Sequence, residues 1–360
     1  MTILSDSFSR SFIGIDFRED SLVISLMRND LSGFKLISSS TFPVRDDDET
    51  TGEIKAFIAR AGEESSVHVC VPHSWAIIKF IQVPSTKGKG ANTLSQMMRF
   101  EIERHIPFQI DNIYYDYQVV DTLGNFQKVM FAAVTRDKID TLNDFLGKLS
   151  LKPRSVSLSP FAVINAIEFS QEKVGGWKEI LGIKGKPYVL GRKGYSCLLM
   201  HIDGRDTHLA VMKDGVCIEY HPFVLEQDIP AVMLISDISA KMEEMLKGTA
   251  VSNVGHMVIS GHSPAMEELS EGLGEKLGLK ISMINAISGY FAGEGDSQAW
   301  SSIPSIGSCY PGMGLGSLKI NLLPHGSETE IGKVGLIVTK VAVPLILFLI
   351  AGIFIGELAY

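Results

Sequence analysis

The sequence predicts an α/β protein with two similar lobes, followed by one membrane-spanning helix. Short apolar runs bounded by turn residues alternate with segments of helical periodicity, which is typical of mixed sheets covered by helices. Two stretches about 190 residues apart share one strand pattern, which indicates an internal duplication. Residues 334–356 carry a single charge, Lys340, and a helix needs about twenty apolar residues to span a bilayer.

The repeated pattern covers residues 12–37 and returns at residues 197–220. In each copy an apolar strand ends in an aspartate, Asp16 or Asp203, and a tight polar turn leads into a second and then a third strand. We therefore predict the following division of the chain: a first lobe at 1–190 with an inserted subdomain at about 80–150, a second lobe at 191–316, a juxtamembrane segment at 317–333 and a transmembrane helix at 334–356.

The remaining elements follow from the spacing of apolar residues. Short apolar runs predict strands at 67–71, 80–83, 114–120, 129–134 and 257–260. Helical spacing predicts helices at 93–106, 138–149, 229–247 and 264–277, and another that begins at Ser159. The stretch 293–316, rich in Gly, Ser and Pro, predicts a loop or a broken last helix, and the charge run 45–49 predicts a solvated loop.

The net charge and the cysteine content limit the partners and the cell compartment that the chain can have. The net charge is −8 and Lys and Arg are not clustered, which argues against a nucleic-acid partner. The four cysteines lie far apart without CxxC spacing, so we expect buried, reduced thiols, no metal site and a cytoplasmic body.

The flanks of the apolar tail predict its orientation. We see no signal peptide, and Lys333 precedes the span, so the positive-inside rule keeps residues 1–333 in the cytoplasm. Lys340 can extend to the interface, and Pro344 is tolerated within a span. The alternative is that 334–356 is a buried core helix.

Several of these residues together resemble a known family. The residues that carry this resemblance are Ile13-Gly-Ile-Asp16, Glu103 to Phe108, Tyr115-Asp-Tyr-Gln-Val119, Leu151-Lys-Pro153 and Ser159-Pro-Phe161. Through them the chain is similar to PilM of type IV pilus assembly and to the cytoplasmic part of GspL of type II secretion, both in the actin-like (ASKHA) superfamily. The pentad Ile320-Asn321-Leu322-Leu323-Pro324 adds to them, because it resembles the cytoplasmic N-terminal motif of PilN, the bitopic protein that docks on PilM.

The resemblance implies a bilobed actin-like body built from duplicated ribonuclease H-like folds. It also implies a non-enzymatic scaffold of the bacterial inner membrane that couples a motor ATPase of the GspE or PilB type to bitopic partners of the GspM, PilN or PilO type. Self-association is expected. The resemblance leaves open whether the machine makes pili or secretes proteins. GspL proteins continue into a periplasmic domain, whereas about four residues follow the predicted span here. The alternatives are a membrane-anchored ATPase or kinase-fold enzyme and an actin-like polymer-former.

A nucleotide site is the second implication of the resemblance. If ATP and Mg²⁺ bound, Asp16 and Asp203 would face the metal ion through water, and Ser21 and Thr207 would contact phosphate. In this superfamily the first loop is Gly-rich, because glycine lets the backbone approach phosphate. Here residues 17–20 contain no glycine, and the adenosine loop is reduced to Ser260-Gly261-His-Ser. The second loop keeps Asp203-Gly204. We therefore expect no hydrolysis and, at most, residual nucleotide binding; both aspartates are more simply explained as turn-closing residues.

The pentad is the candidate partner-binding motif. Ile320, Leu322 and Leu323 are apolar residues of an extended segment that ends at Pro324. Such a segment can add to a groove or sheet edge, with Asn321 satisfying backbone groups and the aliphatic side chains filling pockets. We expect it to dock on the body of its own chain or of a neighbouring copy. The alternative is a plain juxtamembrane linker.

Overall fold

The computed structural model describes residues 10–323, with gaps at 31–32, 46, 63, 87–90, 170–193, 205, 227–228, 248–250, 252–253, 264 and 285–298. The chain divides into two units, Met1–Leu323 and Pro324–Tyr360, and the fold presented here is that of the first. Within the described residues, no helix is long and apolar enough to cross a bilayer. Pro324 and the predicted membrane helix at 334–356 lie outside the described residues.

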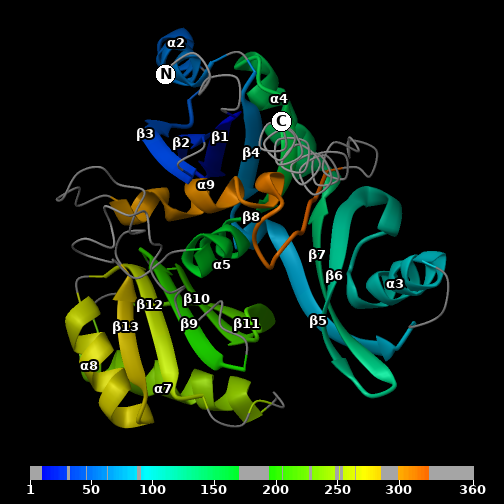
Figure 1. The fold of residues 1–360 in the computed structure, drawn as a ribbon, viewed down its shortest axis with the longest axis vertical. Helices are drawn as coiled ribbons and strands as arrows, with labels where there is room; N and C mark the ends of the chain where they lie inside the picture. The colour runs from blue at the N-terminus through cyan, green and yellow to red at the C-terminus, as the bar shows by residue number, and fades with distance from the viewer. Residues whose placement is uncertain are drawn as a thin grey trace, which may run out of the picture. The chain divides into compact units, whose positions relative to one another are not determined.

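Two five-stranded sheets share one topology (Figure 1). The first has the order β3-β2-β1-β4-β8, with β2 antiparallel to both β1 and β3, and with β4 parallel to both β1 and β8. Its strands are β1 (Arg10–Phe17), β2 (Ser21–Asp30), β3 (Gly33–Pro43), β4 (Ser66–Val71) and β8 (Pro153–Leu158).

The second sheet repeats this order as β11-β10-β9-β12-β13, with equivalent strand directions. Its strands are β9 (Ser196–Asp203), β10 (Asp206–Lys213), β11 (Val216–Val224), β12 (His256–His262) and β13 (Lys280–Ile284). The duplication inferred from the two Asp-ended strand patterns is therefore confirmed.

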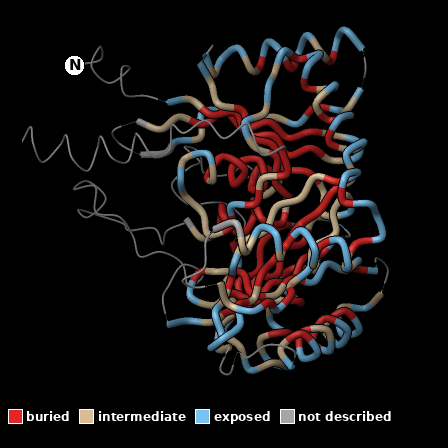
Figure 2. Tube along the Cα trace, turned by 90° about the vertical axis from the view of Figure 1, so that its right-hand side faces the viewer, coloured by how far each residue is buried: buried red, intermediate tan, exposed pale blue. Residues whose placement is uncertain are grey.

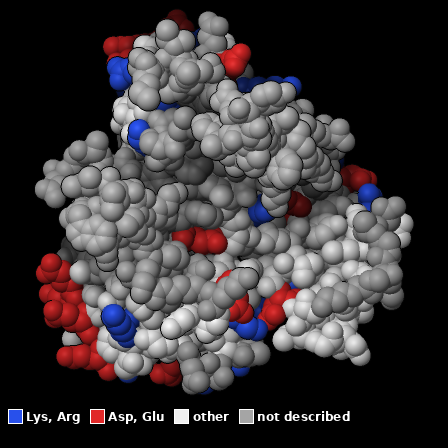
Figure 3. All heavy atoms as spheres, in the orientation of Figure 1, with Lys and Arg blue, Asp and Glu red and all other residues white. Residues whose placement is uncertain are grey.

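The alternation of side chains along β9 shows how the second sheet is covered. Leu198, Met200 and Ile202 pack with helices α7 (Ala231–Lys247) and α8 (Met266–Leu277). The exposed surface of α8 is acidic and carries Glu267, Glu268, Glu271 and Glu275 (Figure 3). Cys197 and Leu199, on the opposite face, belong to the larger core shared with the first lobe (Figure 2). A sheet buried on both faces explains the nearly continuous apolar run of this strand.

Within the described part of the first lobe, the helices are α2 (Asp48–Ile58), α4 (Arg136–Lys148), α5 (Ser159–Phe169) and α9 (Ile303–Ser308). Helices α5 and α9 pack against each other, with α9 against β1 and α5 against β8 and β9. Among the described residues, 3-10 turns lie at η1 (Ala59–Ala61), η2 (His73–Trp75), η3 (Ile110–Asn112), η5 (Ala299–Ser302) and η6 (Pro311–Met313).

A third, smaller sheet is inserted between β4 and α4. It has the order β5-β7-β6 and consists of β5 (Ala76–Pro84), β6 (Ile113–Leu123) and β7 (Phe126–Thr135), with helix α3 (Ala91–His105) packed on one face. Alternate residues of β7 face two cores: Phe131 packs with the α3 residues Met98 and Ile102, and Met130 joins the main core.

Two sequence expectations change in the structure. The charge run 45–49 is solvent-exposed where it is described, as predicted, but its last two residues belong to the first turn of α2 and are not loop. Asp47 is the N-cap of this helix, and its Oδ1 accepts a hydrogen bond from the Thr50 amide at 2.7 Å. The hydrogen bond from Thr50 also lowers the pKa of Asp47. For residues 293–316, the broken-helix alternative is correct: η5, α9 and η6 follow one another, and every residue of α9 is buried. All four cysteines are buried and free, as expected.

Helix α9 is buried because glycine allows backbone contact on two sides. A Cβ at Gly14 of β1 would lie 1.9 Å from the Ser305 carbonyl oxygen, and a Cβ at Gly307 would lie 1.8 Å from that of Ala162 in α5. Serine hydroxyls join the same helix to the sheet, with Ser25 Oγ 2.7 Å from Ser305 Oγ. No side chain larger than hydrogen fits at either glycine without moving the backbone.

This packing predicts opposite effects of Gly→Ala at two helical positions. Gly307→Ala forces α9 away from α5 and should lower the free energy of unfolding by about 1–3 kcal/mol. Gly52→Ala in α2, where a Cβ would meet nothing within 4 Å, should raise it by about 0.5–1 kcal/mol. Urea unfolding of both variants measures the difference. Equal effects at the two positions would show that the α5–α9 contact is not constrained as described.

Candidate functional site

The two aspartates predicted from the sequence lie at the ends of the equivalent strands β1 and β9 and are joined by one cation. The Arg18 side chain donates from Nε to Asp16 Oδ2 at 2.8 Å, and its Nη2 lies 3.5 Å from Asp203 Oδ2. The same Nη2 donates to the Ser301 carbonyl oxygen at 3.1 Å. Arg18 therefore contacts the end of β1, the end of β9 and the turn that precedes α9.

Asp16 is enclosed, with a residue exposure of 1%. Besides the bond from Arg18, it accepts a 2.6 Å hydrogen bond at Oδ1 from the Ser159 hydroxyl, and the Cys70 thiol lies 3.4 Å from the same oxygen. Burial and the neighbouring Asp16 carboxylate raise the pKa of Cys70 well above its ordinary value, so this thiol stays protonated. Asp16 is thus a paired, hydrogen-bonded carboxylate that solvent does not reach.

Asp203 is more exposed than Asp16, with 30% of its side chain accessible. Burial raises the pKa of Asp203, and the charge of Arg18 partly offsets this effect. Burial also works against the charge on Arg18, but Asp16 and Asp203 more than compensate, so the pKa of Arg18 is raised. The guanidinium therefore remains charged between the two carboxylates.

The other residues predicted for a nucleotide have different surroundings. The Ser21 hydroxyl donates to Asp20 at 3.0 Å, and Gly204 supplies the positive φ of 63° in the β9–β10 turn. Thr207 is fully buried and its hydroxyl finds no partner within the described residues. Gly261 has φ 99° and packs on β9, because a Cβ there would lie 1.9 Å from the Ile202 carbonyl oxygen.

The residues at this site fit an internal ion bridge, and they do not fit a magnesium nucleotide, because the Arg18 guanidinium joins the carboxylates of Asp16 and Asp203.

Neutral imidazoles fill the interior next to this ion bridge. The ring of His73, from η2, lies 4.7 Å from that of His208, centroid to centroid, and His208 Nδ1 lies 2.7 Å from the Tyr220 hydroxyl. His201 Nδ1 lies 2.8 Å from Ser260 Oγ, and burial, followed by the charge of Arg18, lowers the pKa of His201 to about 3. These rings pack as uncharged groups, in keeping with a structural role for His201.

The second candidate site is formed by residues 317–323, here termed the docked segment. Leu318, Ile320 and Leu322 are buried to 0%, 1% and 0% exposure, and the intervening Lys319 is exposed. This period of two is that of an extended chain with one face against the protein. The apolar residues of the predicted pentad therefore lie inside the body of their own chain, together with Leu318, which the sequence reasoning had not included.

Helix α5 binds the start of the docked segment. The Asn165 side chain accepts from the Leu318 amide at 3.1 Å and donates to the Leu318 carbonyl at 2.8 Å. One turn later, Glu168 accepts from the Ser317 amide at 2.9 Å. Burial raises the pKa of Glu168, and the hydrogen bond from Ser317 opposes that shift. A three-residue spacing puts both side chains on one face of the helix.

Strand β6 binds the middle of the docked segment. Gln118 donates to the Ser317 carbonyl at 2.6 Å and accepts from the Lys319 amide at 2.9 Å. Asp116 accepts from the Asn321 amide at 2.8 Å. Residues two apart on a strand share a face, so both side chains point at the same stretch of backbone.

The end of the docked segment covers the edge of the first sheet at β8. The Leu322 amide donates to the Val156 carbonyl at 2.7 Å, and the Val156 amide donates to Asn321 Oδ1 at 3.0 Å. Asn321 Oδ1 also accepts from the Leu323 amide at 3.2 Å. The Asn321 side-chain oxygen thus takes the position that the backbone carbonyl of a neighbouring strand would have. The amide and carbonyl of Val156 on the edge strand are therefore both hydrogen-bonded.

The sequence reasoning found the motif but not most of its binding residues. Asp116 and Gln118 belong to a stretch that carried the family resemblance, but no role was assigned to them. Asn165 and Glu168 belong to none of the sequence motifs. Their signal is two polar residues at helical spacing within the apolar helix SPFAVINAIEF.

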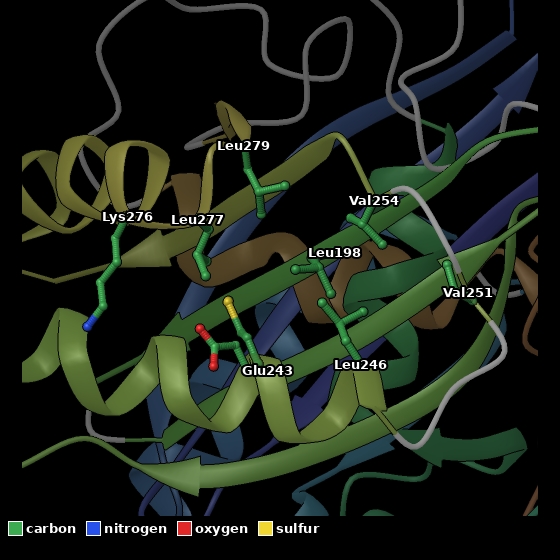
Figure 4. A pocket seen from close by; sticks show the side chains of 9 residues that line it. Leu198, Glu243, Leu246, Val251, Val254, Lys276, Leu277 and Leu279 are labelled. Atoms are coloured by element: carbon green, nitrogen blue, oxygen red, sulfur yellow. The ribbon is translucent and has the colours of Figure 1, made fainter.

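A separate apolar hollow lies between α7, α8 and the start of β9 (Figure 4). Its volume is about 360 Å³, and its walls are aliphatic apart from Met242, Glu243 and Lys276. Leu198 lines it, and this residue lies five positions before Asp203 on β9, or about 16 Å at the rise of a strand. The hollow is therefore distinct from the Arg18 bridge.

Comparison with known proteins gives one family match. Residues 36–179 match the model of a family described as type IV pilus assembly protein PilM. No curated protein matches the sequence.

Three solved structures illustrate the structural likeness. The PilM–PilN type IV pilus biogenesis complex aligns with TM-score 0.64 and 15% identity over 82% of this chain and 96% of that chain. The cytoplasmic domain of EpsL, an inner membrane component of the type II secretion system of Vibrio cholerae, aligns with TM-score 0.43 and 12% identity over 82% and 94%. A Bacteroides thetaiotaomicron protein of unknown function with an actin-like ATPase fold aligns with TM-score 0.43 and 10% identity over 77% and 91%.

The first of these likenesses and the two sheets of equal order confirm the bilobed, actin-like fold expected from the sequence. The family match covers the inserted sheet and α5, which together supply the four side chains that hold the docked segment. Residues 36–179 are therefore similar to the PilM family of type IV pilus assembly proteins, which the sequence motifs also resemble.

Proposed function

We propose that this chain is a non-enzymatic scaffold of a type IV pilus or type II secretion assembly platform, held at the bacterial inner membrane by residues 334–356. The observation that supports this function best is the docked segment. Its backbone is held by side chains of α5 and β6 and by the edge of β8, and its apolar side chains are buried. This arrangement suits a connection that transmits force, because it joins the actin-like body to residues that lead towards the predicted span.

The proposal extends the likeness to the PilM–PilN complex. The name of that complex gives PilM and PilN as two proteins. Here the PilN-like residues 320–324 follow the PilM-like body on one chain, so the body carries its own anchor. The partners we propose are a motor ATPase of the GspE or PilB type, bitopic proteins of the GspM, PilN or PilO type, and a second copy of the chain. The body would face the cytoplasm.

A membrane-anchored ATPase is the alternative function. Its support is the position of Asp16 and Asp203 at the ends of equivalent strands. Against it stand the Arg18 bridge, the burial of Thr207 and the lack of glycine after Asp16. A phosphate would meet the carboxylates of Glu19 and Asp20 in the loop where this superfamily has glycine. These features favour the scaffold.

The scaffold proposal predicts no functional response to ATP. A site with a Kd of about 10 μM would stabilise the protein by about 2.7 kcal/mol at about 1 mM ligand. We expect magnesium ATP at millimolar concentration to leave the melting temperature unchanged relative to magnesium alone, with no phosphate released. Micromolar affinity together with turnover would overturn the non-enzymatic assignment.

The docked segment predicts different effects of one substitution at neighbouring positions. Leu322→Asp places a charge in a fully buried site and should release the segment. Lys319→Asp instead changes an exposed side chain, whose charge acts on Glu168 but is screened by solvent. Amide exchange over residues 317–323 should increase in the first variant and stay near wild type in the second. A labelled peptide of residues 317–323 should bind the Leu322→Asp protein and not the wild type.

The same two variants test the function in cells. Complementation of a strain that lacks the gene should lose pili or secreted protein with Leu322→Asp and keep them with Lys319→Asp. If Leu322→Asp releases the segment in vitro but supports normal assembly, docking has no part in the function. If it neither releases the segment nor changes assembly, the geometry proposed for the docked segment is wrong as well.

A further inference from the structure

The Arg18 side chain contacts both lobes at the place where they meet. Its Nε is bonded to Asp16 of the first sheet, and its Nη2 lies near Asp203 of the second. The distances are 2.8 and 3.5 Å. A guanidinium is suited to this task because it presents donors in a rigid, planar fork, whereas a lysine ammonium is a compact point charge.

A third contact fixes the direction of the fork. Nη2 also donates to the Ser301 carbonyl in η5, which leads into the buried helix α9. Asp16 in turn is held by the hydroxyl of Ser159, the first residue of α5. The position of the guanidinium is therefore set by elements that are themselves packed in the core.

We propose that Arg18 is an internal cation that closes the junction between the two lobes, in the place where a nucleotide-dependent relative would need a bound metal ion and phosphates. The positive charge that satisfies both carboxylates is covalently part of the chain. It follows that the closed arrangement of the lobes needs no ligand, and that a dissolved cation finds no free pair of carboxylates there.

Neighbouring contacts agree with a permanently closed junction. The rings of His73 and His208 pack across it as neutral groups. Two further ion pairs, Lys128–Glu219 and Lys213–Asp121, join the inserted sheet to the second lobe. Both are separate from the Arg18 bridge, so loss of Arg18 should loosen the junction locally while the second lobe keeps its other attachments.

A double-mutant cycle on the full-length chain tests the proposal. Asp203→Asn removes the charge on the second lobe only, and we expect it to lower the melting temperature by about 2–4 °C. Arg18→Ala should lower it further, because it also leaves the buried Asp16 without its cation. The double variant should melt no lower than Arg18→Ala alone, since both changes remove the same contact. Lys241→Ala, which breaks the Lys241–Asp237 pair within α7, is the matched control for loss of a surface charge.

Hydrogen exchange distinguishes an effect of Arg18 on the junction of the two lobes from an effect confined to the β9–β10 turn. In Asp203→Asn, amides at the end of β1 should exchange faster although the substitution lies at the end of β9, and Lys241→Ala should leave them unchanged. Additive melting temperatures in the cycle, or faster exchange confined to the β9–β10 turn, would overturn the proposal. So would a rise in the wild-type melting temperature on addition of millimolar magnesium chloride, because the site would then accept a cation with Arg18 in place. All these readouts concern the body alone, so they are independent of the scaffold function.

Discussion

The position of helix α5 is the constraint on which both sites depend. Its first residue, Ser159, holds the buried carboxylate that Arg18 neutralises, and its second half presents Asn165 and Glu168 to the docked segment. The same helix packs against α9 at backbone distance through Gly307. A shift of α5 would therefore disturb the junction of the lobes and the docked segment together, which makes the two sites parts of one rigid core.

Both sites satisfy buried polar groups with side chains in place of a regular hydrogen-bond ladder. The docked segment is extended but forms no strand, so each of its buried amides needs an acceptor of its own. On β6, Asp116 accepts from the Asn321 amide and Gln118 accepts from the Lys319 amide. In turn, the Asn321 side chain accepts from the Val156 amide at the edge of β8. Such an arrangement tolerates little displacement, because an unmade buried hydrogen bond costs about 1–3 kcal/mol. It therefore fixes the register of the segment as well as its position.

The sequence was sufficient for features that depend on local pattern and insufficient for those that depend on distant contacts. Strands ending in Asp16 and Asp203 revealed the duplication, and the alternation after Leu318 is visible in the sequence once the extended conformation is known. The charge run at 45–49 concealed an N-cap, because like charges indicate a solvated loop and the first turn of a helix equally well. The role of Arg18 was not predictable, since it arises only when strands nearly 190 residues apart meet.

Placing the motif on the same chain changes what its contacts must achieve. A peptide on a separate chain must offset the loss of translational and rotational freedom, estimated at about 4–15 kcal/mol, before any affinity appears. The docked segment follows α9 after a short turn, so its effective concentration at the site is on the order of millimolar or higher. Modest contacts are then enough to keep it bound, and a free partner with the same motif would have to exceed that concentration to replace it. A bitopic partner of this chain is therefore expected to bind a surface other than the one that the docked segment occupies.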